Sequence, residues 1–330
     1  MKNKTLQLLI LVGVFALIMT GYLISSMISR DDSSSDDNTS EIIMLVDLKY
    51  TNVTSVSYKR NGETVKITTD GANGIYYLEN EPEFPLDKTK ATSMTQAVAS
   101  IGCLRLVEDT KVRFGDYGLD TPEFVITATY DTNTSITMNV GSYNSFTQSR
   151  YMNVDGTSKV YMISPSLLDY FDYSKLQLVA NDTKPAIGSD EITKLTIQNK
   201  GGSKIEFTKT DDKWLTAASV EADESKIELI KRAVMGITFS TCADYGVNES
   251  PELDKYGLLT PAATVSASYV KESTVTADTS TSTVPVKTES TFTILIGSTT
   301  EDGKSVYVKL PASELVYTVS AELLSPLLQN

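Results

Sequence analysis

The stretch "DGKS", Asp302 to Ser305, ends like a phosphate-binding loop. That motif needs an earlier glycine, which would fall at position 298, and a helix after its last residue. Position 298 is a serine, and the flanking runs "FTILIG" and "VYVKL" alternate in polarity as strands do. We therefore interpret "DGKS" as the turn of a β-hairpin.

Ser268 and Lys271 have the Ser-x-x-Lys spacing that can pair a nucleophile with a base on a helix. They lie in the alternating run "AATVSASYVK", which predicts a strand. Side chains three residues apart on a strand point to opposite faces. We therefore expect no catalytic pair here.

Asp116 and Asp120 could hold a cation or act as paired acids. Related positions later in the chain are Lys255 and Leu259, so solvated turn residues are the simpler interpretation. No segment has the alternating oxygen ligands and glycine of a calcium loop. We predict no metal, no cofactor and no catalytic residue.

The chain contains no histidine, which removes the commonest general base and nearly every zinc site. An enzyme that uses carboxylates alone stays open, because two acids suffice for glycoside hydrolysis. The two cysteines, Cys103 and Cys242, either form a disulfide or behave as buried apolar side chains. We expect a non-enzymatic protein.

Tyrosine is frequent, with 17 residues in the chain, and several tyrosines fall in or beside predicted strands. Outward tyrosines suit protein interfaces and sugar stacking, whereas inward tyrosines complete sheet faces. These tyrosines are Tyr50, Tyr58, Tyr76, Tyr77, Tyr143, Tyr151 and Tyr161. They allow the alternative that the protein is a cell-envelope glycan-binding or wall-binding module.

The N-terminal residues predict attachment to a membrane. Residues 6–28 carry no charge and are long enough to cross a bilayer as a helix. A cleaved signal peptide is the alternative, but no A-x-A-like site follows the apolar run. Lysines precede the run and aspartates follow it, so residues 1–5 are expected in the cytoplasm and the bulk of the chain outside. Residues 29–40 predict a disordered acidic tether.

The net charge of −13 opposes nucleic acid as a partner, because a phosphate backbone would repel the chain over any distance.

The chain contains an internal repeat, which defines its predicted strands and helices. Nearly the same hexamer occurs twice, as "YGLDTP" at 117–122 and "YGLLTP" at 256–261. Their glycines, Gly118 and Gly257, lie 139 positions apart (257 − 118), and Cys103 and Cys242 have the same separation. After the next strand the offset becomes 156, measured between Gly141 in "MNVGS" and Gly297 in "ILIGS" (297 − 141). The second copy therefore has an insertion of 17 residues (156 − 139), at about 271–290. Its composition permits an extended hairpin or a loop. We predict two repeats, 41–180 and 181–330.

The sequence patterns of the two repeats predict the same secondary-structure elements in the same order. A hairpin and a short strand come first, followed by one longer helix. In the first copy Asp87 can cap this helix and Gly102 lies near its end, and the counterpart in the second copy runs from Asp223 to Met235. An alternating strand follows each hexamer, and a second hairpin and a short helix end the unit. Pro326 is expected to shorten that last helix in the second copy. The predicted fold class is α+β, with two tandem and mostly antiparallel β units after an N-terminal transmembrane helix.

The hexamers predict tight corners that lead into strands. Glycine takes backbone angles closed to other residues, proline fixes φ, and the leucine is expected to fill the core below. The residues of these two structural corners are Tyr117, Gly118, Leu119, Pro122, Tyr256, Gly257, Leu258 and Pro261.

The order of these motifs resembles the DUF4340 family: Y-G-L-x-T-P, an alternating strand, a strand closing in I/V-G-S, V-Y-x-x-S and a Leu-rich helix. The resemblance implies a bacterial protein with a single membrane span. It also implies an accessory, extracytoplasmic role beside a membrane complex, with an ABC-type transporter permease as the expected partner. It supplies no catalytic residue.

Overall fold

The computed structural model describes residues 42–60, 62–70, 73–108, 112–131, 134–202, 204–276 and 283–328. The contacts divide the chain into residues 1–41 and the compact unit Ile42–Asn330. The predicted span 6–28 and tether 29–40 lie outside the described residues. Within the described residues, no helix is both long and apolar enough to cross a membrane.

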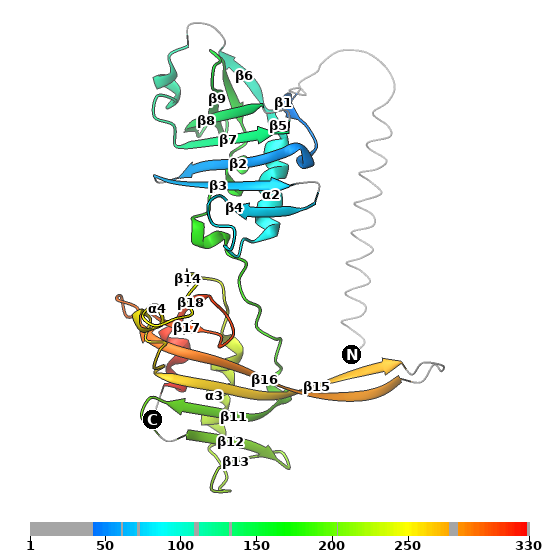
Figure 1. Ribbon diagram of the computed structural model, residues 1–330, viewed down its shortest axis with the longest axis vertical. Coiled ribbons are helices and arrows are strands. Elements are labelled where there is room, and N and C mark those ends of the chain that lie inside the picture. The colour runs from blue at the N-terminus through cyan, green and yellow to red at the C-terminus, as the bar shows by residue number, and fades with distance from the viewer. Residues whose placement is uncertain are drawn as a thin grey trace. The chain divides into compact units, whose positions relative to one another are not determined.

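Two eight-stranded antiparallel sheets form most of the unit (Figure 1). The first has the order β4 (Ile75–Leu78), β3 (Glu63–Asp70), β2 (Val53–Arg60), β7 (Phe124–Tyr130), β8 (Ser135–Asn144), β9 (Ser149–Val154), β10 (Val160–Ile163), β6 (Arg105–Glu108). The second has the order β13 (Lys213–Thr216), β12 (Lys204–Thr210), β11 (Ile192–Asn199), β15 (Ala263–Thr276), β16 (Thr283–Thr299), β17 (Ser305–Lys309), β18 (Val316–Ser320), β14 (Cys242–Asp244). The two sheets match strand for strand, as two copies of one unit would.

One longer helix belongs to each sheet, α2 (Lys88–Ala99) to the first and α3 (Glu224–Gly236) to the second. Asp87 and Asp223 cap them, since each carboxylate accepts a hydrogen bond of 2.9 Å from the backbone N–H two residues later. Their apolar faces are buried in the core, as the spacing predicts. The buried apolar residues are Ala91, Met94, Val98 and Ala99 in α2, and Ile227, Ile230, Ala233 and Val234 in α3.

The end of the first helix differs from the prediction. The sequence indicates a helix that stops near Gly102, but α2 ends at Ala99 and residues Ser100–Cys103 form strand β5. The partner of β5 is β1 (Ile43–Asp47), a strand that is not among the predicted elements. Backbone pairing with β1, from Ile43 opposite Cys103 to Asp47 opposite Ser100, replaces what would be the last helical turn.

The short helices complete each repeat. Pro165–Tyr170 forms the 3₁₀ helix η3, with Ser164 as its N-cap, and α5 (Ala321–Leu324) stands at the equivalent place in the second repeat. Pro326 then lies in a separate 3₁₀ turn, so it limits α5 as the sequence predicts. The remaining short helices are η1 (Tyr50–Asn52), η2 (Phe114–Tyr117), η4 (Lys175–Leu178), η5 (Ser189–Glu191), α4 (Glu252–Lys255) and η6 (Ser325–Leu327).

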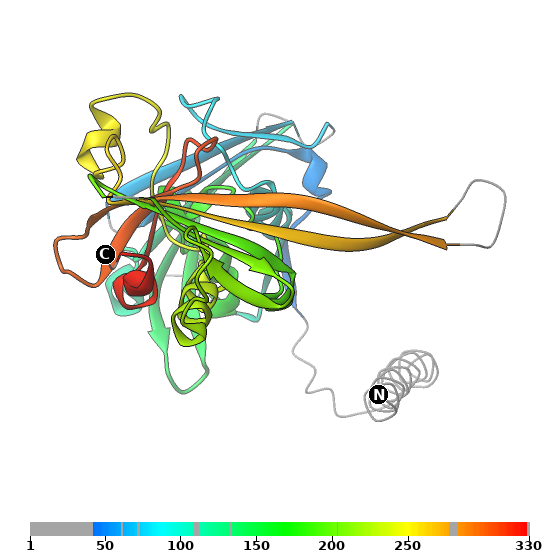
Figure 2. The ribbon, with the colours of Figure 1, turned by 90° about the horizontal axis from the view of Figure 1, so that it is seen from below.

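The predicted insertion is an extended hairpin. Strands β15 and β16 pair continuously from Ala263 opposite Ile296 to Thr276 opposite Thr283. β11 pairs with β15 only as far as Tyr269, and β17 pairs with β16 only from Leu295 onward. Residues 270–276 and 283–289, which we call the arm, therefore form a two-stranded ribbon that projects past the rest of the sheet (Figure 2).

Both cysteines are free thiols, Cys103 buried and Cys242 half-buried. Burial raises the pKa of Cys103 to about 12 and that of Cys242 to about 11. At neutral pH both side chains therefore stay protonated and behave as small apolar groups.

We expect the folded chain to react very slowly with the thiol reagent DTNB at pH 8, because the reactive thiolate is scarce and Cys103 is inaccessible. Denaturation without reductant should release two reactive thiols per chain, measured by absorbance. Release of none would indicate a disulfide instead.

Candidate functional site

Both hexamers contain a turn at their glycine. Gly118 and Gly257 adopt left-handed backbone angles, with φ of 70° and 65°. Leu119 and Leu258 are buried beneath them. Pro122 and Pro261 come shortly before β7 and β15 begin.

Each corner packs against the Gly-Ser pair of the neighbouring strand. A Cβ atom added to Gly141 would overlap the carbonyl oxygen of Tyr117, and one added to Gly297 would overlap that of Tyr256. In the second repeat the Ser298 N–H also donates a 2.8 Å hydrogen bond to the Tyr256 carbonyl. The Y-G-L and I/V-G-S motifs therefore act as a single structural contact, once in each repeat.

The corner tyrosines complete this contact. Tyr117 donates to Glu108 at 2.9 Å, and Tyr256 donates to Asp244 at 2.5 Å. Each ring also meets a second tyrosine edge to face: Tyr117 and Tyr151 have centroids 4.8 Å apart, and Tyr256 and Tyr307 have centroids 4.9 Å apart. The corners are structural features common to both repeats.

Local hydrogen bonds and ion pairs engage four of the polar residues that could do chemistry: Asp116, Ser268, Lys271 and Asp302. Asp302 accepts hydrogen bonds from Thr300 Oγ1 and Lys304 N in the turn between β16 and β17, so "DGKS" is a hairpin turn. Ser268 hydrogen-bonds to Thr291, whereas Lys271 pairs with Glu191 at 2.6 Å. Asp116 pairs with Arg113.

The tyrosines divide between the core and the surface. Tyr58 and Tyr161 are buried, Tyr76 and Tyr151 are half-buried, and the exposed ones are Tyr50, Tyr77 and Tyr143. Tyr77 on β4 and Tyr143 on β8 are separated by three strands. Phe146, which is 98% exposed, lies in the same hairpin turn region as Tyr143.

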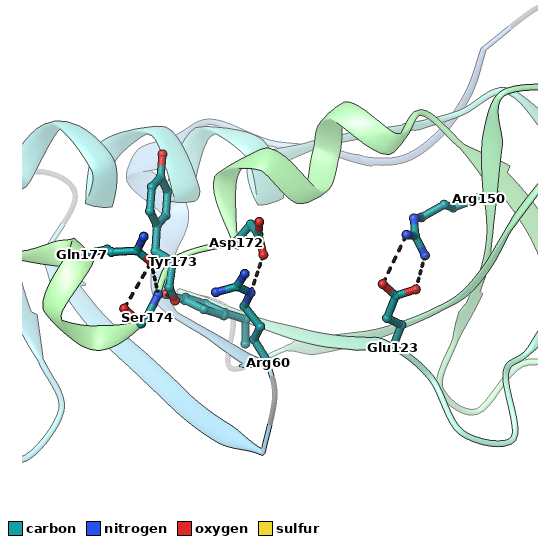
Figure 3. A network of polar contacts seen from close by, with 8 residues as sticks. Arg60, Glu123, Arg150, Asp172, Tyr173, Ser174 and Gln177 are labelled. Atoms are coloured by element: carbon teal, nitrogen blue, oxygen red, sulfur yellow. Dashed lines mark hydrogen bonds and ion pairs between the residues drawn. The ribbon is translucent and has the colours of Figure 1, made fainter. Parts of the chain in front are cut away.

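The contact between the two repeats contains residues that no sequence motif indicates. It begins with the segment after η3, which runs beside the first sheet (Figure 3). Arg60 pairs with Asp172, the Tyr58 hydroxyl donates to the Tyr173 carbonyl at 2.8 Å, and Gln177 accepts from Ser174 N at 2.8 Å. A separate pair, Arg150 with Glu123, joins β9 to the start of β7. The bonds of Asp172, Tyr173 and Ser174 hold the start of η4, whose first residue is Lys175.

The same segment then follows the loop between β4 and α2. Asp87 N donates to the Leu178 carbonyl and Ala180 N donates to the Pro85 carbonyl, both at 2.7 Å. This pairing sets the side chain of Lys175 against Glu81, which lies early in that loop.

Glu81 joins three separate parts of the chain. One carboxylate oxygen accepts from Lys175, and the other accepts from the hydroxyl of Tyr245, which follows β14 in the second repeat. Phe84 meets the Tyr245 ring edge to face at 4.8 Å between centroids. The Lys175 ammonium lies 5.1 Å from the Tyr245 centroid and 5.8 Å from the Phe84 centroid. We call these four residues the clasp.

The charges in the clasp stabilise one another. The hydrogen bonds from Lys175 and Tyr245 lower the pKa of Glu81. Burial alone would lower the pKa of Lys175, but the bonds with Glu81 and Tyr245 raise it above its usual value. Glu81 and Lys175 therefore form an ion pair at neutral pH, and the Tyr245 hydroxyl keeps its proton.

A second contact lies beside the clasp. Asp182 accepts a 2.5 Å hydrogen bond from Ser313 Oγ, and its backbone N–H donates to the Tyr317 hydroxyl at 2.7 Å. The buried ammonium of Lys309 is attracted to Asp182 and Glu314, and burial lowers its pKa.

The lowered pKa of Glu81 predicts acid-sensitive stability. A depressed folded-state pKa contributes stability that is fully present above the ordinary carboxyl value of about 4 and is lost as pH falls below it. Because the pair is partly exposed, we expect Glu81→Gln to cost less than about 1 kcal/mol at pH 6 and almost nothing at pH 3. Urea unfolding at both pH values measures this, and an equal cost at both would contradict it.

The resolved pKa shifts of the described carboxyl groups all have one direction. Where a carboxyl pKa departs clearly from its usual value among these residues, it is lowered, as in Glu81, Glu191, Glu206 and Asp302. A general acid needs a raised pKa. The described residues also contain no group of three or more acidic or cysteine side chains placed to hold a metal ion.

Comparisons with known proteins gave one family. The model described as "Domain of unknown function (DUF4340)" matches residues 77–261 and again residues 216–330. The comparison with curated proteins and the comparison with solved structures each found no match. The family match agrees with the resemblance carried by the corner motifs.

Proposed function

Since the chain belongs to the DUF4340 family, whose function is unknown, we propose that it is a non-enzymatic accessory protein of a membrane complex. Residues 6–28 anchor it, residues 1–5 lie in the cytoplasm, and the two repeats lie outside the membrane, where they contact a partner. An ABC-type transporter permease is the partner that we favour. The uncharged run at 6–28 and its flanking charges support the anchor.

The arm is the observation that carries the proposal. The first repeat joins its equivalent strands, β7 and β8, through the short connection from Asp131 to Thr134, so the shared fold has no need of the arm. A two-stranded ribbon is marginally stable alone, and its free edges can pair with another chain. A long ribbon of this kind is best explained by a partner that covers it.

Cross-linking in the native membrane tests the proposal. The full chain carries a C-terminal tag, and mild cross-linking precedes extraction in a gentle detergent and identification of the captured proteins. We expect a multi-span permease and its ATPase to be recovered reproducibly. A correctly inserted chain that captures no stable partner would contradict the proposal.

Tyr143 and Phe146 favour a second candidate function, binding of a cell-envelope glycan. Both are exposed in one hairpin of the first repeat, and aromatic faces stack on sugars. The matching positions in the second repeat, at an offset of 156, are Thr299 and Asp302. This candidate predicts that the chain is retained on purified wall material and released by Tyr143→Ser with Phe146→Ser. Absence of retention at low salt would refute it.

A further inference from the structure

A cavity of about 630 Å³ lies beside the clasp, within the size range of small-ligand sites. One wall comes from the loop between β4 and α2, which contributes Pro82, Phe84 and Pro85. The other comes from the second repeat, where Tyr245 and Leu315 line it. These side chains give the cavity an aromatic and apolar surface.

Four carboxylates also line this cavity: Glu81, Glu83, Asp182 and Glu314. Two cations oppose these four carboxylates: Lys175 pairs with Glu81, and the buried Lys309 attracts both Asp182 and Glu314. Glu83 and Glu314 are exposed, and neither forms an ion pair within the part of the chain that the structure describes. The cavity therefore keeps an excess of negative charge beside its apolar walls.

In the clasp, a cation already lies against the rings of Phe84 and Tyr245. The Lys175 ammonium interacts with the rings of both Tyr245 and Phe84, while its own charge is paired with Glu81. Lys175 does not itself line the cavity. Faces of aromatic rings combined with carboxylates are the usual recognition elements for ammonium and guanidinium groups.

The second repeat shows that the shared fold does not require this chemistry. Asp87 and Asp223 begin equivalent helices at an offset of 136 residues (223 − 87). The loop before α2, residues 79–86, holds three glutamates and Phe84, whereas the loop before α3, residues 217–222, holds one glutamate, Glu221, and no aromatic residue. The acidic and aromatic residues are particular to the loop that faces the cavity.

We infer that this cavity binds an ammonium or guanidinium group carried on an aliphatic stem. The stem lies against Phe84 and Leu315, and the charged end lies between Glu83 and Glu314. The source is either a free amine or a lysine or arginine side chain of another protein. This inference does not depend on the proposed membrane role.

Fluorine NMR on the full-length chain tests the inference. The chain, purified in a mild detergent, is labelled with 4-fluorophenylalanine, and Phe84→Leu identifies the Phe84 resonance among the nine phenylalanines. The probes are cadaverine for a free amine, and Nα-acetyl-lysine methylamide and Nα-acetyl-arginine methylamide for a protein side chain. The neutral control is 1,5-pentanediol.

We expect a saturable shift of the Phe84 resonance with at least one cationic probe, and binding at least about ten-fold weaker for the diol. The double variant Glu83→Gln/Glu314→Gln should weaken binding at least about five-fold. Glu289→Gln, which changes an exposed carboxylate on the arm, should leave it unchanged. Tighter binding of the two amides than of cadaverine would identify a protein side chain as the ligand, and the reverse a free amine.

Two results would overturn the inference. One is the absence of a saturable shift with all three cations. The other is equal binding by the double variant and the unchanged chain, because a site without a charge requirement is not a cation site.

Discussion

Gly257→Ala is expected to lower the free energy of unfolding by about 3 kcal/mol. A left-handed backbone costs a residue with a side chain about 1–2 kcal/mol, and overpacking adds about 1–3 kcal/mol. The second term arises because the new Cβ would lie 2.8 Å from the backbone nitrogen of Ser298. Urea unfolding followed by the fluorescence of Trp214, the single tryptophan, measures the change in the second repeat.

Gly303→Ala is the matched control for this prediction. Gly303 has φ of 72°, and an added Cβ would have nothing within 4 Å, so only the backbone term remains. We expect a loss of about 1 kcal/mol. Equal losses in the two variants would show that the close approach of the corner to the Gly-Ser pair contributes little to stability.

Removing the arm is expected to lower the amount of cross-linked partner recovered by at least about ten-fold, while the repeats stay folded. The variant replaces residues 270–290 with the first repeat's own connection, Asp131 to Thr134, which joins equivalent strands. It loses the exposed Lys271–Glu191 ion pair, and exposed ion pairs contribute little to stability. Recovery of cross-linked partner through the C-terminal tag is compared with that of the unchanged chain.

The control for the arm is Lys287→Ala/Glu272→Ala. It removes an exposed ion pair of 2.7 Å but keeps the ribbon. This variant should recover most of the partner, because surface ion pairs contribute little. Full recovery by the armless chain would mean that the partner contacts another surface.

The sequence predicted the features that depend on local pattern. The offset between Gly118 and Gly257 indicated one unit used twice, and the two sheets have matching strand orders. Asp87 and Asp223 marked the starts of both helices, because a cap is a local contact. The change of offset also placed the insertion. It did not distinguish a hairpin from a loop, since strand pairing depends on the whole register.

The features that the sequence did not predict depend on distant contacts. Strand β5 exists because β1, which lies more than fifty residues earlier, supplies its partner. Glu81 meets Tyr245 across a separation of 164 residues, and no motif connects them. The corner and Gly-Ser motifs were both visible, but only the structure shows that they pack together.

A photo-cross-linker at Val286 tests the central claim most directly. Val286 is exposed on the arm, whereas Asp302, in the turn at the opposite end of β16, serves as the control site. With p-benzoylphenylalanine at each position in native membranes, we expect Val286 to cross-link to a multi-span membrane protein and Asp302 to give little product. No adduct from Val286, or the same adduct from both sites, would contradict the claim that the arm contacts a membrane partner.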